Sequence, residues 1–204
     1  MRHGRSLKPD VMAIVIEPLT PKLLPEWLNF FDNIAFADNP AWADCYCCCY
    51  QLACSNEEWG KRTKGQNRNS SIEYIKAGKM KGYLAFENSL PVGWCNVNEH
   101  QAFPRMSVYK GVESLVRKGK TASVICFIIA HTHRGKGIAR MMLRQAASDY
   151  SGKGFDFLEA FPRTGVPLTP ADQFHGPLQL YLSEGFEVSN NFEKYAVVNK
   201  RLNQ

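Results

Sequence analysis

The chain has 204 residues, of which 45% are hydrophobic and 22% are charged, as in an ordinary folded domain. No apolar run approaches the ~20 residues that a membrane-spanning helix needs. The basic stretch at residues 1–10 is not followed by an apolar segment long enough for a signal peptide. We therefore expect a single cytosolic domain over 1–204, with a core from about residue 12 to residue 200 and a flexible segment at 1–10.

The net charge of +6 raises the question of a nucleic-acid partner. The basic residues are scattered along the chain, and none of them forms a dense tract interleaved with aromatic residues. A modest basic excess suits a phosphate-rich small-molecule cofactor equally well. We therefore expect neither a nucleic-acid partner nor a membrane partner.

The seven cysteines are a poor disulfide framework, because their number is odd and five of them lie between Cys45 and Cys54. A zinc site is the alternative interpretation of this cluster. However, no CxxC pair is followed by a second pair or by HxxxH at zinc-finger spacing, and the histidines are distant in sequence. Free cysteine also packs as a small hydrophobic residue. We favour packing over a metal site, in a reducing compartment.

Periodicity predicts a mixed α/β domain whose elements follow the order β-α-α-β-β-β-α-β-α-β-β. In the first half we expect a strand at 12–17, a helix from Thr20-Pro21 to Phe31, an irregular connection at 36–54, helical segments within 55–79, and a hairpin of strands at 83–86 and 91–97. Ser55 with Glu58 forms a capping box, and we expect a helix break at 65–69 before Ser70 opens a second helix.

In the second half, the run 123–130 is the strongest strand signal and is apolar enough to be buried on both faces. The helix that follows, at 137–150, presents a core stripe of Ile138, Met141, Met142 and Ala146. The remaining expected elements are a short helix near 110–117, a strand at 155–161, a helix at 173–183, and strands at 186–189 and 192–199 around an Asn190-Asn191 turn.

The chemistry is concentrated where the buried strand turns into the helix, at Arg134-Gly135-Lys136-Gly137. A helix start leaves about four N–H groups without intrahelical partners and carries roughly half a positive charge. The two glycines let an anion approach the backbone closely, and Arg134 and Lys136 add formal charge. This combination predicts a pyrophosphate site. Neither a P-loop nor a complete GxGxxG dinucleotide fingerprint is present, so those two nucleotide-binding classes are disfavoured.

The turn resembles the acetyl-CoA signature of the GNAT superfamily of N-acyltransferases, which is Gln or Arg, two residues, Gly, one residue, then Gly or Ala. Arg134, Gly137 and Ala139 fill its fixed positions. The segment from Leu180 to Phe186, LYLSEGF, is similar to a second family landmark, LYxxxGF. The element order also matches, so the resemblance covers about residues 14–198. It implies a single-domain GNAT-like fold and acetyl-CoA as co-substrate.

The resemblance also implies roles for residues of the cofactor site. The backbone near Phe127 and Ile129 would pair with the pantetheine arm, and the N–H of Ile129 would polarise the thioester carbonyl as an oxyanion-hole donor does. The pyrophosphate would be held by the N–H groups of Arg134, Gly135, Lys136, Gly137, Ile138 and Ala139.

Tyr181 matches the tyrosine that protonates the departing CoA thiolate in this family, a step that suits a phenol with pKa near 10. Glu159, on the strand beside the cofactor strand, is the candidate base that accepts the proton of the attacking amine. His131 and His133 are alternatives by pKa, but they occupy the turn before the phosphate loop, where we expect surface residues.

The acceptor side departs from the family pattern. Many members carry a cofactor-binding asparagine before the penultimate helix, where this chain offers Gln173. The proline-rich connection at 162–173 and the aromatic-cysteine stretch Trp42–Tyr50 are expected to wall the acceptor pocket. An enclosed aromatic pocket favours a small-molecule amine over a protein amine. The alternatives are transfer to protein amines, or an acyl-CoA sensor without turnover. A homodimer is compatible with the resemblance.

Overall fold

The computed structural model describes residues 13–108, 111–112, 115, 117, 119–165, 167–169 and 171–202. The segment at 1–10, expected to be flexible, lies outside these residues. The short helix expected near 110–117 falls largely outside them as well, and none of the four described positions in that range is helical.

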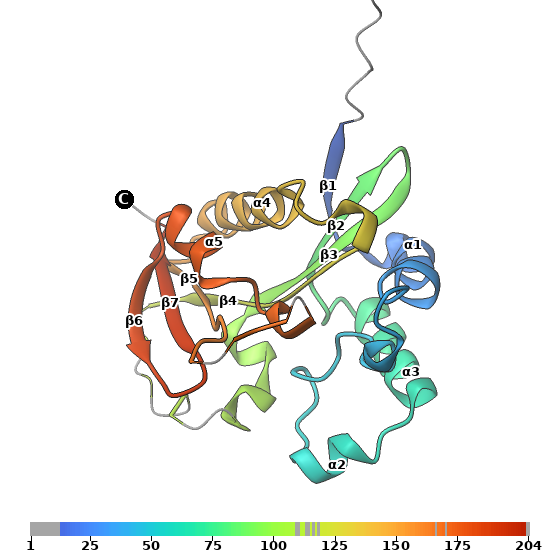
Figure 1. Cartoon of the computed structure of the whole chain (residues 1–204), viewed down its shortest axis with the longest axis horizontal. Helices are drawn as coiled ribbons and strands as arrows, with labels where there is room; N and C mark the ends of the chain where they lie inside the picture. The colour runs from blue at the N-terminus through green and yellow to red at the C-terminus, as the bar shows by residue number, and fades with distance from the viewer. Residues whose placement is uncertain are drawn as a thin grey trace, which may run out of the picture.

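Within the described residues, seven strands form one mixed sheet in the order β1-β2-β3-β4-β5-β7-β6 (Figure 1). The strands are β1 (Ile14–Pro18), β2 (Gly82–Glu87), β3 (Leu90–Glu99), β4 (Thr121–Ile129), β5 (Phe157–Ala160), β6 (Glu187–Asn191) and β7 (Ala196–Arg201). Only β4 and β5 pair in parallel among the neighbouring strands of this sheet. The expected fold class and the expected order of strands are confirmed.

The described residues form five α-helices, namely α1 (Leu24–Asn29), α2 (Asn56–Gly60), α3 (Lys64–Lys76), α4 (Ile138–Gly152) and α5 (Leu178–Ser183). A π-helical turn at Phe30–Ile34 extends α1. Short 3₁₀ helices lie at Pro21–Leu23, Pro40–Trp42, His100–Ala102, Pro104–Val108, His131–His133 and Ala171–Gln173.

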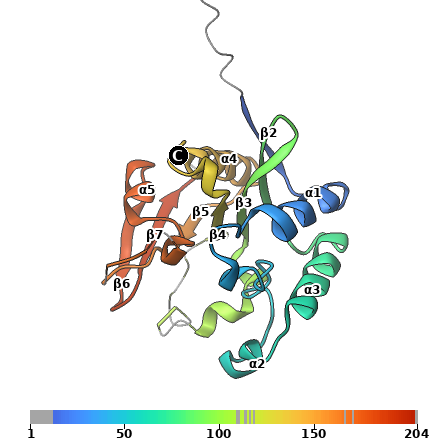
Figure 2. The ribbon, with the colours of Figure 1, turned by 45° about the vertical axis from the view of Figure 1, so that its right-hand side comes forward.

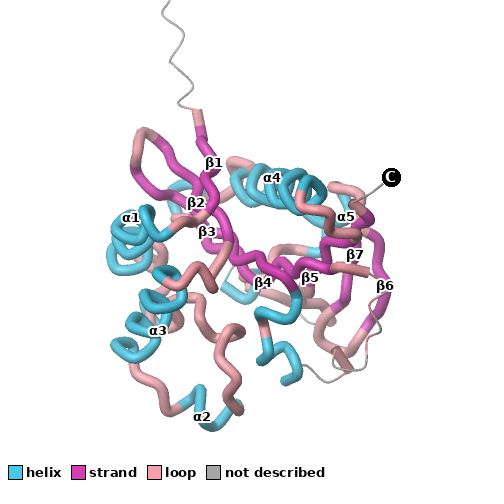
Figure 3. Tube along the Cα trace, turned by 180° about the vertical axis from the view of Figure 1, so that it is seen from behind, coloured by secondary structure: helices cyan, strands magenta, loops and turns pink. Residues whose placement is uncertain are grey.

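The helices cover both faces of the sheet. On β3, Gly93 lies against Ile138 of α4, whereas the next residue, Trp94, packs its ring against Trp27 of α1. Because successive strand residues point to opposite faces, α4 and α1 lie on opposite sides of the sheet (Figure 3). Figure 2 shows α2 and α3 at the side of the sheet away from β6 and β7. The core around α1 is rich in aromatic rings, among them Trp27, Phe31 and Trp94.

Local capping explains where α2 and α3 begin. The expected Ser55–Glu58 capping box is present at the start of α2. The expected break at 65–69 is wrong, because a second capping box, Thr63 with Gln66, starts α3 at Lys64. The break therefore lies at 61–63, and Gly65 is inside the helix. The capping box at the start of α3 outweighs the low helix propensity of Gly65.

Three expectations for the C-terminal half need correction. Met141 is 39% exposed, and Leu143 and Tyr150 complete the buried face of α4 instead. The helix expected at 173–183 begins only after Pro177, which has extended backbone and caps α5. The turn expected at Asn190-Asn191 is wrong, because β6 continues through Asn191 and the chain reverses at 192–195.

Buried amide side chains anchor the segment 44–51, which connects the 3₁₀ helix at Pro40–Trp42 to α2. Asn96 on β3 donates to the backbone oxygen of Cys47 at 3.0 Å and accepts from Gln51 at 3.1 Å. Asn67 on α3 donates to the backbone oxygen of Asp44 at 2.8 Å. Tyr46 and Cys47 hold the left-handed conformation, with φ of 43° and 50°. Non-glycine residues in this conformation are strained, so the segment depends on these external bonds.

Replacement of Asn96 tests this anchoring. Asn96→Ala should lower the free energy of unfolding by about 3 kcal/mol, because it leaves the Cys47 carbonyl and the Gln51 amide buried without partners. Urea unfolding at pH 7 measures the change. Asn69→Ala, at an exposed site on α3, is the control and should change stability by less than about 0.5 kcal/mol. Equal stability of the two variants would contradict the anchoring role.

Candidate functional site

The site is built on the free edge of β4. The parallel ladder with β5 covers only Thr121–Val124, so the rest of β4 has no strand beside it on that side. Ala130 N–H bonds to Val92 on the β3 side, whereas Phe127 N–H points to the other side. By the alternation of the ladder, Ile129 N–H also points away from β3. No acceptor for it is present in the described part of the chain.

A short segment before α5 lies along this edge. The backbone oxygen of Phe174 accepts the N–H of Phe127 at 2.6 Å, and the imidazole Nδ1 of His175 bonds to the backbone oxygen of Ile125. The hydroxyl of Tyr181 donates to the backbone oxygen of His175 at 2.5 Å. The gap between β4 and β5 is therefore occupied by protein near Phe127 and open near Ile129.

A cleft of about 780 Å³ opens from this edge toward the start of α4. Its walls include most of the predicted cofactor residues, which are Phe127, Ile129, Arg134, Gly135, Gly137, Ile138 and Ala139. Lys136 is exposed and does not line the cleft. Gln173, expected as a replacement for the family asparagine, does line it.

The start of α4 has the features of an anion site. Its N-cap, Gly137, has φ of 78° and no side-chain cap, and the first turn holds no acidic residue. A Cβ atom added at Gly135 or Gly137 would meet nothing within 4 Å, so the space in front of these backbone atoms is open. The residues therefore fit a phosphate group bound by the N–H groups of the first turn.

The side chain of Arg134 is already paired. Its two terminal nitrogens contact the carboxylate of Asp38 at 2.5 and 3.0 Å, and its Nε donates to the backbone oxygen of Ile129 at 3.2 Å. The positive charge of Arg134, expected from the sequence to face the pyrophosphate, is thus shared with Asp38. Arg140, a cleft residue that the motif does not include, pairs with Glu184 at 2.9 Å.

Tyr181 lies one layer behind the cleft wall. Its side chain is fully buried, and burial raises the pKa of its phenol well above the ordinary value. Its hydroxyl is close to Gly176, which lines the cleft. Tyr181 and Phe127 are brought together, with ring centroids 6.5 Å apart. A proton from Tyr181 can reach the cleft only after the bond to His175 is exchanged.

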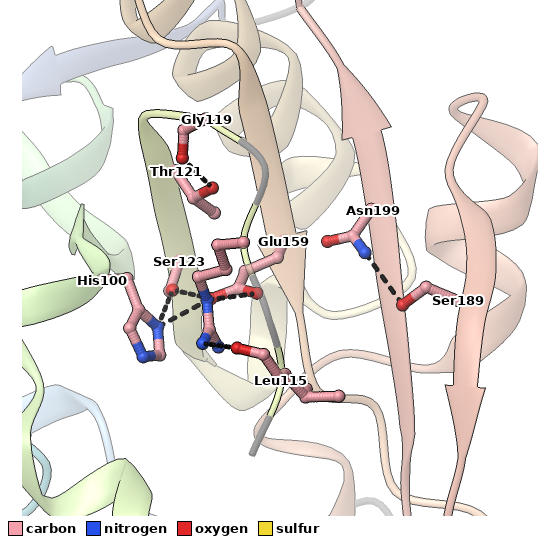
Figure 4. A network of polar contacts seen from close by, with 9 residues as sticks. His100, Leu115, Gly119, Thr121, Ser123, Glu159, Ser189 and Asn199 are labelled. Carbon is pink, nitrogen blue, oxygen red and sulfur yellow. Dashed lines mark hydrogen bonds and ion pairs between the residues drawn. The ribbon is translucent and has the colours of Figure 1, made fainter. Parts of the chain in front are cut away.

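Glu159 does not line the cleft. It lies instead in a polar network with Ser123 and His100 (Figure 4). Its carboxylate contacts Arg117 Nε at 3.0 Å and His100 Nδ1 at 2.7 Å, and it accepts from the hydroxyl of Ser123 at 2.6 Å. It faces a separate cavity of about 210 Å³ beside β6 and β7. Burial alone would raise the pKa of Glu159, but the His100 bond, the Arg117 charge and the Ser123 bond hold that pKa below its usual range. A carboxylate held in this way is a weak base.

The two histidines of the turn have different environments. His131 is exposed, as expected for a surface residue. His133 is buried, which corrects the expectation that it lies on the surface. Its Nε2 contacts Glu87 at 3.1 Å, and its Nδ1 contacts the hydroxyl of Thr132 at 2.8 Å. It lines the cleft beside Arg134.

A second cavity of about 440 Å³ adjoins the cleft. The two share the residues Phe36, Trp42, Ile128 and Phe174. The Trp42–Tyr50 stretch contributes much of its wall, as the sequence analysis expected for an acceptor pocket, with the thiols of Cys45, Cys47 and Cys49 beside Cys126 of β4. All seven cysteines are free, and no three metal-binding side chains are gathered anywhere in the described residues.

Phe36 and Phe174 are the site residues that motif analysis missed. Both lie between the cleft and the second cavity, in irregular segments without a hydrophobic period. The only available signal was their aromatic character close to prolines. Among the described residues, no helix is long and apolar enough to cross a membrane.

Comparisons with known proteins identify the family and the fold. Residues 40–176 match the model of the acetyltransferase (GNAT) family. The N-acetyltransferase from Staphylococcus aureus Mu50 is similar in structure, with a TM-score of 0.54 and 15% identity over 93% of this chain and 99% of that one. PaiA N-acetyltransferase from Thermoplasma acidophilum, solved in complex with coenzyme A, has a TM-score of 0.53 and 15% identity over 93% and 99%.

The structure of the NatC complex bound to Gag peptide and CoA is also similar, with a TM-score of 0.54 and 17% identity over 94% of this chain and 99% of that one. At such identities these structures support the fold alone. No curated protein matches the chain in sequence.

The anion site at Gly137 is testable with a matched pair of variants. Gly137→Leu should weaken CoA binding at least tenfold, because its side chain fills the space in front of the first-turn N–H groups. Gly154→Leu is the control, since Gly154 has nearly the same φ, 73°, and equally open surroundings away from the cleft. Both variants should lose about 1–2 kcal/mol of stability from backbone strain. Unchanged CoA affinity in Gly137→Leu, measured by calorimetry, would show that the anion site is misplaced.

The environment of Glu159 predicts a stability role. Folding lowers the pKa of Glu159, so the ionised carboxylate adds to the free energy of unfolding. This contribution is present above the unfolded pKa, near 4.5, and is lost as pH falls through the lower folded pKa. Glu159→Gln should lower the free energy of unfolding at pH 7 by about 3 kcal/mol and flatten its decline below pH 4.5. Urea unfolding at pH 7 and in acid measures both effects. Glu57→Gln, at an exposed ion pair, is the control. Unchanged stability with a large loss of turnover would restore Glu159 as the base.

Proposed function

Because this chain belongs to the GNAT acetyltransferase family, we propose that it transfers an acetyl group from acetyl-CoA to the primary amine of a small molecule. The observation that carries the proposal is the junction of the two cavities. The cleft has an open anion site at one end, and it shares wall residues, among them Ile128 of β4, with a second cavity. One cavity can hold the acyl donor and the other its acceptor.

In this proposal the first turn of α4 holds the pyrophosphate of acetyl-CoA. The uncapped N–H groups and the helix dipole supply the positive potential there. The apolar wall formed by Phe127, Ile138 and Leu180 covers the pantetheine arm. Bound acetyl-CoA supplies an activated thioester.

The N–H of Ile129 is the proposed donor to the thioester carbonyl. It lies on the free edge of β4 and has no acceptor within the described chain. A backbone donor held by a strand costs little reorganisation when negative charge develops on the carbonyl oxygen. Phe127 N–H can serve the cofactor only where the Phe174 oxygen releases it.

Tyr181 remains the proposed acid for the CoA thiolate. The hydroxyl of Tyr181 is bonded to the backbone oxygen of His175, behind Gly176. For Tyr181 to reach the thiolate, the segment with His175 and Gly176 must shift when the cofactor binds. Glu159 is left out of the proposed proton path, because its carboxylate is bonded to Arg117 and His100 and faces another cavity. We propose instead that the amine loses its proton to water, so that kcat/KM rises with pH toward the pKa of the acceptor.

A small-molecule acceptor suits the second cavity better than a protein amine. Its volume of about 440 Å³ lies within the range of small-ligand pockets, and aromatic side chains line it. The test is a titration of the protein with acetyl-CoA, CoA and ATP, followed by thiol release with an amine library. Binding of both CoA species but not ATP, with thiol release, supports the proposal. Binding without release for any amine would favour an acyl-CoA sensor.

Tyr181→Phe should lower kcat about 100-fold and leave the affinity for acetyl-CoA unchanged, because it removes only the proton donor. Tyr150→Phe is the matched control, since Tyr150 is also a buried tyrosine that donates to a backbone oxygen, that of Val97, away from the cleft. Steady-state kinetics and calorimetry provide the two readouts. Equal turnover in Tyr181→Phe and Tyr150→Phe would refute the acid role.

A further inference from the structure

The second cavity contains a cation without a carboxylate partner. Arg62 lines it, in the short link between α2 and α3. The guanidinium is held by neutral groups, with Nε donating to the Asn67 side chain at 2.6 Å and one terminal nitrogen donating to the Gln66 backbone oxygen at 3.1 Å and to the Ser70 hydroxyl at 2.7 Å. No ion pair of Arg62 occurs among the described residues.

This guanidinium is fixed and still has donors to offer. Its other terminal nitrogen, Nη1, has no acceptor in the described part of the chain. Asn67, which is buried, bonds Arg62 through its oxygen and the Asp44 backbone through its nitrogen. The position of the cation is therefore tied to the cavity wall. An arginine that is held in place loses little entropy when it binds a carboxylate, and charge-assisted bonds of this kind are strong.

A second unpaired guanidinium lies close by. Arg105 is 5% exposed, contacts the Cys49 sulfur, donates to the Asn56 side chain at 2.6 Å and covers the Trp59 ring. Like Arg62, it has no carboxylate partner among the described residues. Cys49 and Trp59 line the cavity, so this charge lies one residue behind its wall. Buried positive charge next to a cavity favours an anionic occupant.

The remaining wall suits an apolar body. Rings of Trp42, Tyr50, Trp59 and Phe174 line the cavity together with cysteine sulfurs, which make favourable contacts with aromatic groups. Asp44, which is exposed, is the one acidic residue that lines it within the described chain. An acceptor with an aromatic or large apolar group matches these surfaces.

We infer that the second cavity binds an amine that also carries a carboxylate, with Arg62 holding the carboxylate and the aromatic wall holding an apolar side chain. The class of acceptor is thus an aromatic amino acid or a close analogue. This inference rests on the proposed function for the identity of the cavity as an acceptor site. It adds the chemical class of acceptor that Arg62 and the aromatic wall would select.

Binding to the CoA-loaded protein is the decisive measurement, because it is informative with or without acetyl transfer. The probes are L-phenylalanine and phenethylamine, which differ by the carboxylate alone. The wild-type protein should bind phenylalanine at least tenfold more tightly. Arg62→Gln should abolish this preference and leave phenethylamine affinity unchanged. Arg68→Gln is the control, since Arg68 is a nearby arginine of α3 that pairs with Asp32 and does not line the cavity.

Arg62→Lys is a second variant, which serves if Arg62→Gln does not fold. Lysine keeps the positive charge of Arg62 and loses its planar pair of donors. It should retain part of the preference, and CoA affinity should stay normal in every folded variant. Equal affinity of the wild type for the two probes, no binding of either, or a preference that survives Arg62→Gln would each overturn the inference. Thiol release with the same probes tests the proposed function separately. Arg62-dependent binding without release would refute the transferase proposal and leave the carboxylate site standing.

Discussion

The short parallel ladder between β4 and β5 is the constraint on which the site depends. It ends at the pair Val124–Ala160, and beyond it β4 continues with one edge unsatisfied. Backbone N–H groups that leave a ladder need other partners. Phe127 finds one in the Phe174 oxygen, while Ile129 remains open toward the cleft. The chain then turns from β4 into α4, whose N-terminus has no side-chain cap. This N-terminus lies at the Ile129 end of the gap between β4 and β5.

Hydrogen bonds to buried polar side chains, rather than regular secondary structure, shape the wall of the second cavity formed by the segment 44–51. The segment 44–51 has no strand or helix of its own, and side chains of Asn67, Ser71 and Asn96 bond its backbone oxygens. Asn67 also fixes Arg62, so the same carboxamide organises the loop and the charge in the cavity. A buried polar network that is satisfied in this way favours one conformation. The selectivity proposed for the cavity follows from that rigidity.

The sequence was most informative where the signal is local. The glycine turn before α4, the capping box at Ser55 and the strand at β4 depend on neighbouring residues, and each lies close to its expected position. The position of Glu159 depends on partners from distant segments, His100 and Arg117, that no short-range pattern contains. Met141 fits the helical period, but α4 is rotated so that Leu143 and Tyr150 face the sheet.

The antiparallel pairing of β1 with β2 also determines how the second cavity can change. The whole chain between these strands, with α1, α2 and α3, leaves the sheet at Leu19 and returns at Gly82, whose backbone oxygen bonds the Leu19 N–H at 2.8 Å. Closing such a loop costs entropy that grows only slowly with length, by ~0.6 kcal/mol for each doubling. Changes of length at exposed positions of this excursion, away from its buried residues, therefore cost little loop-closure entropy. A lineage can remodel the second cavity by such changes while the strands beside the cleft keep their register.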